Sequence, residues 1–193
     1  MADKRHAIFT ALEKTGQSVE EALVAWVGAA AALDLLYWET LEEAFGARTA
    51  HRIYSKVWEK LALGNLDHVL DALGVRDNIN IKTIGQISKV YWESINCPYT
   101  VVEETDDIHV GEITICPYWE SLKEIFGEER ARDCCKKGMG ATTANYYQAI
   151  IKALGKWDEI YATQDKCMCL GDDVCRVVFK KRKNSCEEVP TNF

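Results

Sequence analysis

The sequence predicts an α+β fold: an N-terminal helical segment followed by helices packed on an antiparallel sheet with a small-molecule pocket. Three observations predict it. Residues 1–75 show apolar side chains at helical spacing, two β-rich runs flank Asp106-Asp107, and a second helical block precedes two further strand candidates. Because the chain has 193 residues, of which 48% are hydrophobic, these elements are enough to bury a substantial core.

Capping signals set the bounds of the first helices. Ser18 and Glu21 have the spacing of a capping box, and the helix that they open can run to Gly46. Glycine tolerates the left-handed conformation that follows many helix C-termini, so it also predicts the ends of the next two helices. These are residues 49–63 before Gly64 and residues 65–73 before Gly74.

Beyond residue 80 the pattern changes between helical and strand-like periods. The expected elements are a helix at 83–94, strands at 100–105 and 108–115, helices at 118–126 and 128–154, and strands at 159–163 and 176–181. The expected organisation is a helical segment at 1–75, an α+β ligand- and metal-binding domain at 76–183 and a flexible tail at 184–193, within one compact unit.

Charge and targeting signals exclude several classes of protein. Lys and Arg total 23 against 30 Asp and Glu, which gives a net charge of -7 and argues against a nucleic-acid partner. The N-terminus lacks the apolar region and cleavage site of a secretory signal, so we expect a cytoplasmic protein. The apolar run 22–36 is rich in alanine and contains Asp34, which does not suit a membrane span. Its small residues would permit a close helix pair in a homodimer.

A weak internal repeat joins residues 37–46 and 118–127, which share Tyr-Trp-Glu at the start and Phe-Gly at the end. The Trp, Leu and Phe of each segment lie on one helix face. Two interpretations remain open, namely two similar core helices or the duplication of a helical unit.

Cys116 is the candidate nucleophile. If Asp106-Asp107 is a two-residue hairpin loop, Cys97 lies opposite Cys116, and Pro117 at the first helical position places Cys116 at the helix N-cap. There the helix dipole and free N–H groups favour a thiolate. The alternative is that Cys116 is a small buried apolar residue.

The same hairpin register places Glu104 opposite His109. The pair is either an acid–base pair or a surface contact between neighbouring strands.

A second group of cysteines lies near the end of the chain. The turn at 170–173 folds the chain back and can bring Cys175 close to Cys167 and Cys169, while a helix supplies Cys134 and Cys135. Three or four converging thiolates suit tetrahedral zinc, and an iron–sulfur cluster would use the same ligands. The alternative is a set of buried thiols in a small sheet.

These motifs resemble a known superfamily over residues 97–180. It joins the 4-vinyl-reductase domain, the ligand-sensing domain of phenol-responsive bacterial activators and the L-2-amino-thiazoline-4-carboxylic acid hydrolase-like proteins. The hydrolase-like branch is suggested by Cys116-Pro117-Tyr118-Trp119-Glu120 with Cys134-Cys135. The sensing branch is suggested by Cys135-Lys136-Lys137-Gly138-Met139-Gly140 and by Cys167 and Cys175 around Gly171-Asp172.

The resemblance implies a structural zinc held by Cys135, Cys167 and Cys175. Gln164 stands where the sensors have a glutamate ligand, and Cys169 could take its place. It also implies an apolar pocket for a small, often aromatic or heterocyclic ligand. Aromatic side chains suited to such a pocket, or simply to the core, are Trp119, Tyr146, Tyr147 and Trp157.

The resemblance leaves two functions open. One is a hydrolase that opens a small heterocyclic or thiol-derived substrate by using Cys116 or a metal-activated water. The other is a non-catalytic ligand-binding or sensor protein, or an iron–sulfur carrier.

Overall fold

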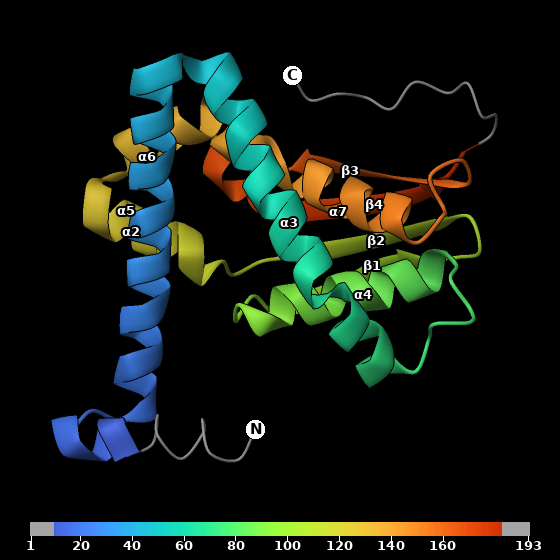
Figure 1. The fold of residues 1–193 in the computed structure, drawn as a ribbon, viewed down its shortest axis with the longest axis horizontal. Helices are drawn as coiled ribbons and strands as arrows, with labels where there is room; N and C mark the ends of the chain where they lie inside the picture. The colour runs from blue at the N-terminus through green and yellow to red at the C-terminus, as the bar shows by residue number, and fades with distance from the viewer. Residues whose placement is uncertain (1–9, 183–193) are drawn as a thin grey trace.

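The computed structural model describes residues 10–182 and confirms the α+β class (Figure 1). Four antiparallel strands form one sheet in the order β1-β2-β4-β3. They are β1 (Tyr99–Glu104), β2 (Ile108–Ile113), β3 (Ile160–Lys166) and β4 (Cys175–Lys181). The tail predicted at 184–193, which includes Cys186, lies outside the described residues.

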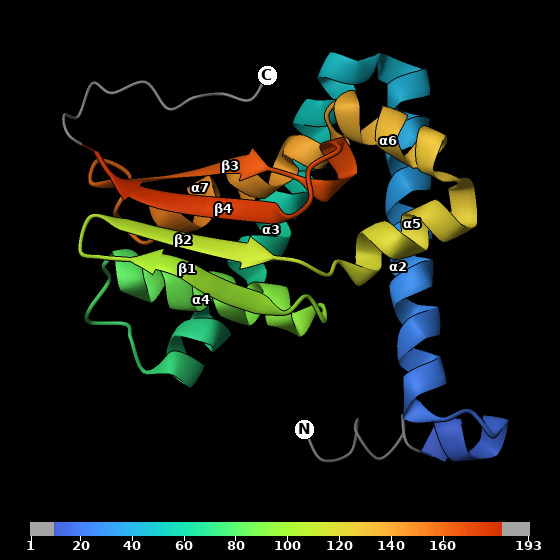
Figure 2. The same ribbon diagram turned by 180° about the vertical axis from the view of Figure 1, so that it is seen from behind.

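The helices occupy two places relative to this sheet. Helices α3 (Ala47–Leu73), α4 (Ile81–Ser94) and α7 (Thr142–Ala153) lie behind the sheet in Figure 2. Helices α2 (Val19–Phe45), α5 (Pro117–Phe126) and α6 (Glu128–Lys136) stand at one end of it. Short 3₁₀ turns, η1 (Met139–Ala141) and η2 (Met168–Leu170), precede α7 and follow β3. Among the described helices, none is long and apolar enough to cross a membrane.

Helix α2 begins and ends where the capping signals predict. The hydroxyl of Ser18 accepts a hydrogen bond from the Glu21 amide, and the Glu21 carboxylate accepts one from the Ser18 amide. Gly46 ends the helix. The predicted break at Gly64 is wrong, because α3 continues through it to Gly74. A glycine inside a helix costs only about 1 kcal/mol, which the packing of α3 against α7 outweighs.

The long helix predicted at 128–154 is instead two helices separated by η1. Gly138 adopts φ 132°, which a residue with a side chain rarely adopts, and this ends the helical path after α6. A Cβ at Gly140 would lie 2.9 Å from the sulfur of Cys169. The glycines therefore turn the chain and let it pass close to the cysteine segment, which helical periodicity alone does not indicate.

The internal repeat corresponds to two similar corners. Gly46 (φ 75°, ψ 157°) separates α2 from α3, and Gly127 (φ 81°, ψ 148°) separates α5 from α6. In both corners the next helix begins directly after the glycine, and helices α2 and α5 pack against each other. Ala50 and Ala131, which hold equivalent places in the repeat, are both fully buried. This geometry suits either interpretation of the repeat.

The N-terminal half of α2 extends away from the sheet (Figure 1). Its apolar side chains are exposed on several sides, including Val24 at 68% and Trp26 at 75%. Homodimer formation through this helix stays a prediction.

The hairpin forms around Asp106-Asp107 as predicted, with a change of register along it. Glu104 pairs with His109 near the turn, whereas a bulge between Val101 and Glu103 shifts the pairing, so that Tyr99 lies opposite Ile113. The His109 side chain is buried, whereas the Glu104 side chain is 38% exposed, so their contact joins a buried imidazole to a carboxylate at the surface.

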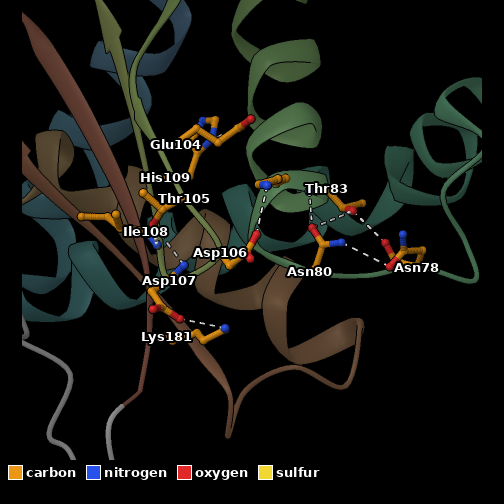
Figure 3. A network of polar contacts seen from close by, with 11 residues as sticks. Asn78, Asn80, Thr83, Glu104, Thr105, Asp106, Asp107, Ile108, His109 and Lys181 are labelled. Carbon is orange, nitrogen blue, oxygen red and sulfur yellow. Dashed lines mark hydrogen bonds and ion pairs between the residues drawn. The ribbon is translucent and has the colours of Figure 1, made fainter.

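A network of polar contacts closes this end of the sheet (Figure 3). Asn80 caps α4 by accepting a hydrogen bond from the Thr83 amide at 3.0 Å. The two turn aspartates form ion pairs, Asp106 with Lys82 at 3.0 Å and Asp107 with Lys181 at 2.8 Å. We call this region the turn end of the sheet.

Candidate functional site

A pocket of about 340 Å³ lies at the opposite end of the sheet, where β2 and β3 end and β4 begins. We call this region the pocket end. Side chains from α2, α3, α4, α5, α6 and α7 contribute to its lining. The pocket is therefore shared by the two segments expected at 1–75 and 76–183. All seven predicted site residues line it: Cys116, Trp119, Cys135, Tyr146, Cys167, Cys169 and Cys175.

Aromatic rings in edge-to-face contact form one wall of the pocket. Tyr146 stands at the centre of this wall: its ring lies 5.2 Å from that of Tyr91, 5.3 Å from that of Tyr147 and 6.3 Å from that of Trp58. Such contacts hold the rings rigidly and present apolar surface. Trp157, by contrast, is not part of the lining, and the Arg182 guanidinium lies 4.9 Å from its ring.

Cys116 occupies the N-cap of α5, as predicted. Its sulfur accepts a hydrogen bond from the Trp119 amide at 3.4 Å. The neighbouring thiol of Cys97 lowers the pKa of Cys116, and the pKa of Cys97 is raised in turn. The bulge in β1 does not separate the two thiols. Cys116 is 7% exposed and lines the pocket, a setting that suits either a nucleophile or a buried apolar residue.

The four cysteines predicted as metal ligands lie together. The Cys167 and Cys169 sulfurs are 3.1 Å apart, Cys167 also contacts Cys175, and Cys169 contacts Cys135. The turn that joins them is held by the Asp172 carboxylate, which accepts from the Cys167 amide at 2.7 Å. We call these four residues the thiol cluster.

Hydrogen bonds inside the thiol cluster favour a negative charge on one sulfur. Contact with Cys169 and Cys175 lowers the pKa of Cys167. The pKa of Cys169 is raised by Cys135 and Cys167, and that of Cys175 is raised by Cys167.

The sulfurs of the thiol cluster contact one another in pairs. Across residues 10–182, no group of three or more His, Cys, Asp or Glu side chains is arranged to hold a metal ion. Gln164, at the place of the sensors' glutamate ligand, lines the pocket, and its side-chain amide donates to the Lys166 carbonyl at 3.3 Å. Zinc and iron–sulfur binding therefore stay predictions.

The prediction from sequence missed Asp34 as a site residue. This carboxylate lines the pocket from α2, and the hydroxyls of Tyr54 and Tyr118 both donate to its Oδ2 atom. Burial raises the pKa of Asp34, and the two tyrosine hydrogen bonds oppose that effect. The available signal was a single acidic residue inside the otherwise uncharged run 22–38 of a helix.

Positively charged side chains are absent from the described lining of the pocket. Of the described residues that line it, none is Lys, Arg or His, and Asp34 is the one carboxylate. Its fixed polar groups are otherwise hydroxyls, amides and thiols. The site thus suits neutral or positively charged molecules better than anions.

Comparisons with known proteins identify the fold. No family model and no curated protein matches the chain. A trafficking protein particle complex subunit 3 from Naegleria fowleri, in a structure covalently bound to palmitic acid, has a TM-score of 0.55 and 15% identity; the match covers 82% of this chain and 96% of that one. The phenol-responsive sensory domain of the transcription activator PoxR, solved with phenol, has a TM-score of 0.50 and 15% identity. This match covers 80% of this chain and 74% of that one.

At this level of identity the comparisons establish a shared fold alone. The likeness to a phenol-responsive sensory domain shows that the chain has a sensor-like fold. Neither structure is a thiazoline-carboxylate hydrolase, so the comparisons give the hydrolase-like branch of the predicted superfamily no support.

Proposed function

We propose that the protein is a ligand-binding domain that takes a small, mostly apolar molecule with an aromatic or heterocyclic ring. The observation that carries this proposal is the pocket of about 340 Å³ with its wall of aromatic rings. Two proteins of similar fold provide further support, because one was solved with phenol and the other with covalently bound palmitic acid.

The pocket favours binding over hydrolysis of a thiazoline carboxylate. Such a substrate brings a carboxylate into the site, and no Lys, Arg or His among the described residues lines the pocket to pair with it. The buried carboxylate of Asp34 would repel it. A nucleophilic role for Cys116 remains a prediction that rests on its N-cap position.

Binding of neutral aromatic probes tests the proposal. Isothermal titration should show saturable binding of indole and of 2-phenylethanol, since both are small enough for a pocket lined by Trp58, Trp92 and Trp119. A Thr143→Trp variant should weaken both probes by at least about tenfold, because the added ring fills the cavity. Lys152→Trp is the matched control, since it adds the same ring to an exposed position of the same helix.

Two results would contradict the proposal. One is the absence of saturable binding of either probe to the wild type. The other is equal affinity of the wild type and a Thr143→Trp variant whose circular dichroism and urea midpoint show that it is folded.

The thiol cluster supports a second proposal, that the protein takes up a thiophilic metal. Four sulfurs from three separate segments of the chain contact one another, three of them on buried cysteines and one on the half-buried Cys169. A closed set of four thiolates would make the metal structural. Zinc is the metal we expect, with an iron–sulfur cluster as the alternative.

Metal content and visible absorption of anaerobically purified protein test this second proposal. Zinc without a visible band supports the expected metal, and iron with a visible band supports the alternative. Cys167→Ser should lose the metal, whereas Cys97→Ser, outside the thiol cluster, should keep it. Protein that contains neither metal after purification and reconstitution would refute the proposal.

A further inference from the structure

Asp34 differs from the other carboxylates of the described chain in its surroundings. It is half-buried in the wall of an apolar pocket, and its two hydrogen bonds come from the neutral tyrosines Tyr54 and Tyr118. No lysine, arginine or histidine among the described residues forms an ion pair with it. Burying a carboxylate without a cation is costly, so its presence at this position calls for an explanation.

The two tyrosines leave half of the carboxylate available. Both hydroxyls donate to Oδ2, and no hydrogen bond from a described residue reaches Oδ1. Tyr54 is 2% exposed and is held by rings on both sides, with Trp38 at 5.4 Å and Trp58 at 6.2 Å. The orientation of the carboxylate is therefore fixed before any ligand arrives.

The surroundings of the free oxygen suit a positive charge. Tyr54, Trp58 and Tyr118 place aromatic surface in the same lining as Asp34, and aromatic faces attract ammonium groups. A cation would also supply the charge that the buried carboxylate lacks. An anion would meet Asp34 without any lysine, arginine or histidine of the described lining to stabilise it.

We propose that Asp34, held by Tyr54 and Tyr118, is the recognition group of the pocket and that the ligand carries a protonated amine on an aromatic or apolar body. The amine donates to Oδ1 of Asp34, while the rest of the molecule occupies the aromatic part of the pocket. This inference rests on the proposed ligand-binding function and names the chemical class of the ligand.

A series of three probes with one ring and different charges tests the inference. They are phenethylamine, which is positively charged, 2-phenylethanol, which is neutral, and 3-phenylpropionate, which is negatively charged. Isothermal titration should show that phenethylamine binds the wild type about tenfold to a hundredfold more tightly than 2-phenylethanol, the range of a charge-assisted hydrogen bond. The anion should bind more weakly than either.

An Asp34→Asn variant keeps the shape of the side chain and removes its charge. It should bind phenethylamine and 2-phenylethanol within about twofold of each other, because the charge-assisted hydrogen bond is lost. Glu43→Gln is the matched control, since it removes an exposed negative charge from the same helix and should keep the full preference for the amine.

The outcomes separate this inference from the proposed function. If 2-phenylethanol binds and phenethylamine binds no better, the pocket is a binding site and the amine inference is wrong. If Asp34→Asn folds and keeps the preference for the amine, the assignment to Asp34 is wrong. If no probe of the series binds, both proposals fall. The wild-type series needs no variant, so the inference stays open to refutation even if Asp34→Asn does not fold.

Discussion

Each end of the sheet holds an ionisable side chain, His109 fully buried and Asp34 half-buried, and the two have different surroundings. At the turn end, His109 has a partner on both ring nitrogens: Glu104 on Nδ1 at 2.8 Å and Tyr99 on Nε2 at 2.9 Å. At the pocket end, Asp34 receives hydrogen bonds on one oxygen only and faces a cavity. An unpaired buried polar group is costly. The hydrogen bonds of His109 are therefore complete, whereas Oδ1 of Asp34 is left for the ligand that we propose.

Packing around the two groups differs in the same way. A Cβ on Gly85 would lie 2.3 Å from the His109 ring, and one on Gly111 would lie 1.8 Å from the Tyr99 hydroxyl. Side chains therefore fill the space beside Gly85 and Gly111, whereas the pocket end contains a cavity of about 340 Å³. We therefore expect variants at the turn end to change stability and to leave ligand affinity unchanged. Variants at the pocket end should change ligand affinity and leave stability unchanged.

The largest expected effect comes from Gly85→Ala. The added methyl group would overlap the His109 ring, which its two hydrogen bonds hold in place, so we expect a loss of about 3 kcal/mol in the free energy of unfolding. Gly64→Ala is the matched control. Apart from its chain neighbours and the backbone of α3 itself, no described atom lies within 4 Å of a Cβ at this position, so the variant should gain about 0.5–1 kcal/mol.

Urea unfolding measures both variants. Equal stability of Gly85→Ala and wild type would mean that His109 can move aside, and the turn end would then not be a closed structure. Indole affinity, measured on the folded fraction of each variant, should stay at the wild-type value.

Local signals in the sequence account for most of the fold. The capping box at Ser18, the cap at Gly46 and the loop at Asp106-Asp107 each depend on neighbours within a few residues, and each is confirmed. The two errors, at Gly64 and in the expected helix 128–154, depend on distant contacts. Packing against α7 stabilises α3 as a continuous helix across Gly64. The turn η1 places Gly140 beside Cys169, which interrupts the expected helix 128–154.

The candidate site could be predicted in part for the same reason. Chemically distinctive residues such as the cysteines could be selected from the sequence, and the structure brings them to one pocket. Asp34 could not be selected, because its partners Tyr54 and Tyr118 are distant in the chain. A single aspartate on a helix has no local pattern that distinguishes a solvated side chain from a buried one.

Acidic pH provides a further test of the turn end, because it protonates His109 and gives the buried ring a positive charge. Burial lowers the pKa of His109 from its ordinary value of 6.5, and the Glu104 carboxylate opposes that shift only in part. Well above pH 6.5, His109 is neutral in both the folded and the unfolded chain. As the pH falls below 6.5, His109 is protonated in the unfolded chain before it is protonated in the folded one. The free energy of unfolding therefore falls by up to about 1.4 kcal/mol per pH unit.

Urea unfolding at pH 7.5, 6.5 and 5.5 measures this effect. His109→Gln should flatten the decline between pH 6.5 and 5.5, whereas His68→Gln, which removes an exposed histidine, should keep it. An unchanged slope in His109→Gln would show that the buried histidine is not the group responsible.

The smallest expected effects come from the surface of the turn end. Asn80→Ala removes the side chain that caps α4 and should cost about 1 kcal/mol. Lys82→Ala removes only an ion pair with Asp106 whose partners are 48% and 85% exposed, so its effect should stay below about 0.5 kcal/mol. Because both changes lie far along the sheet from Asp34, phenethylamine affinity should match that of the wild type in each. A tenfold change in that affinity for Asn80→Ala would mean that the two ends of the sheet are energetically coupled. The expectation that turn-end variants change stability alone would then be wrong.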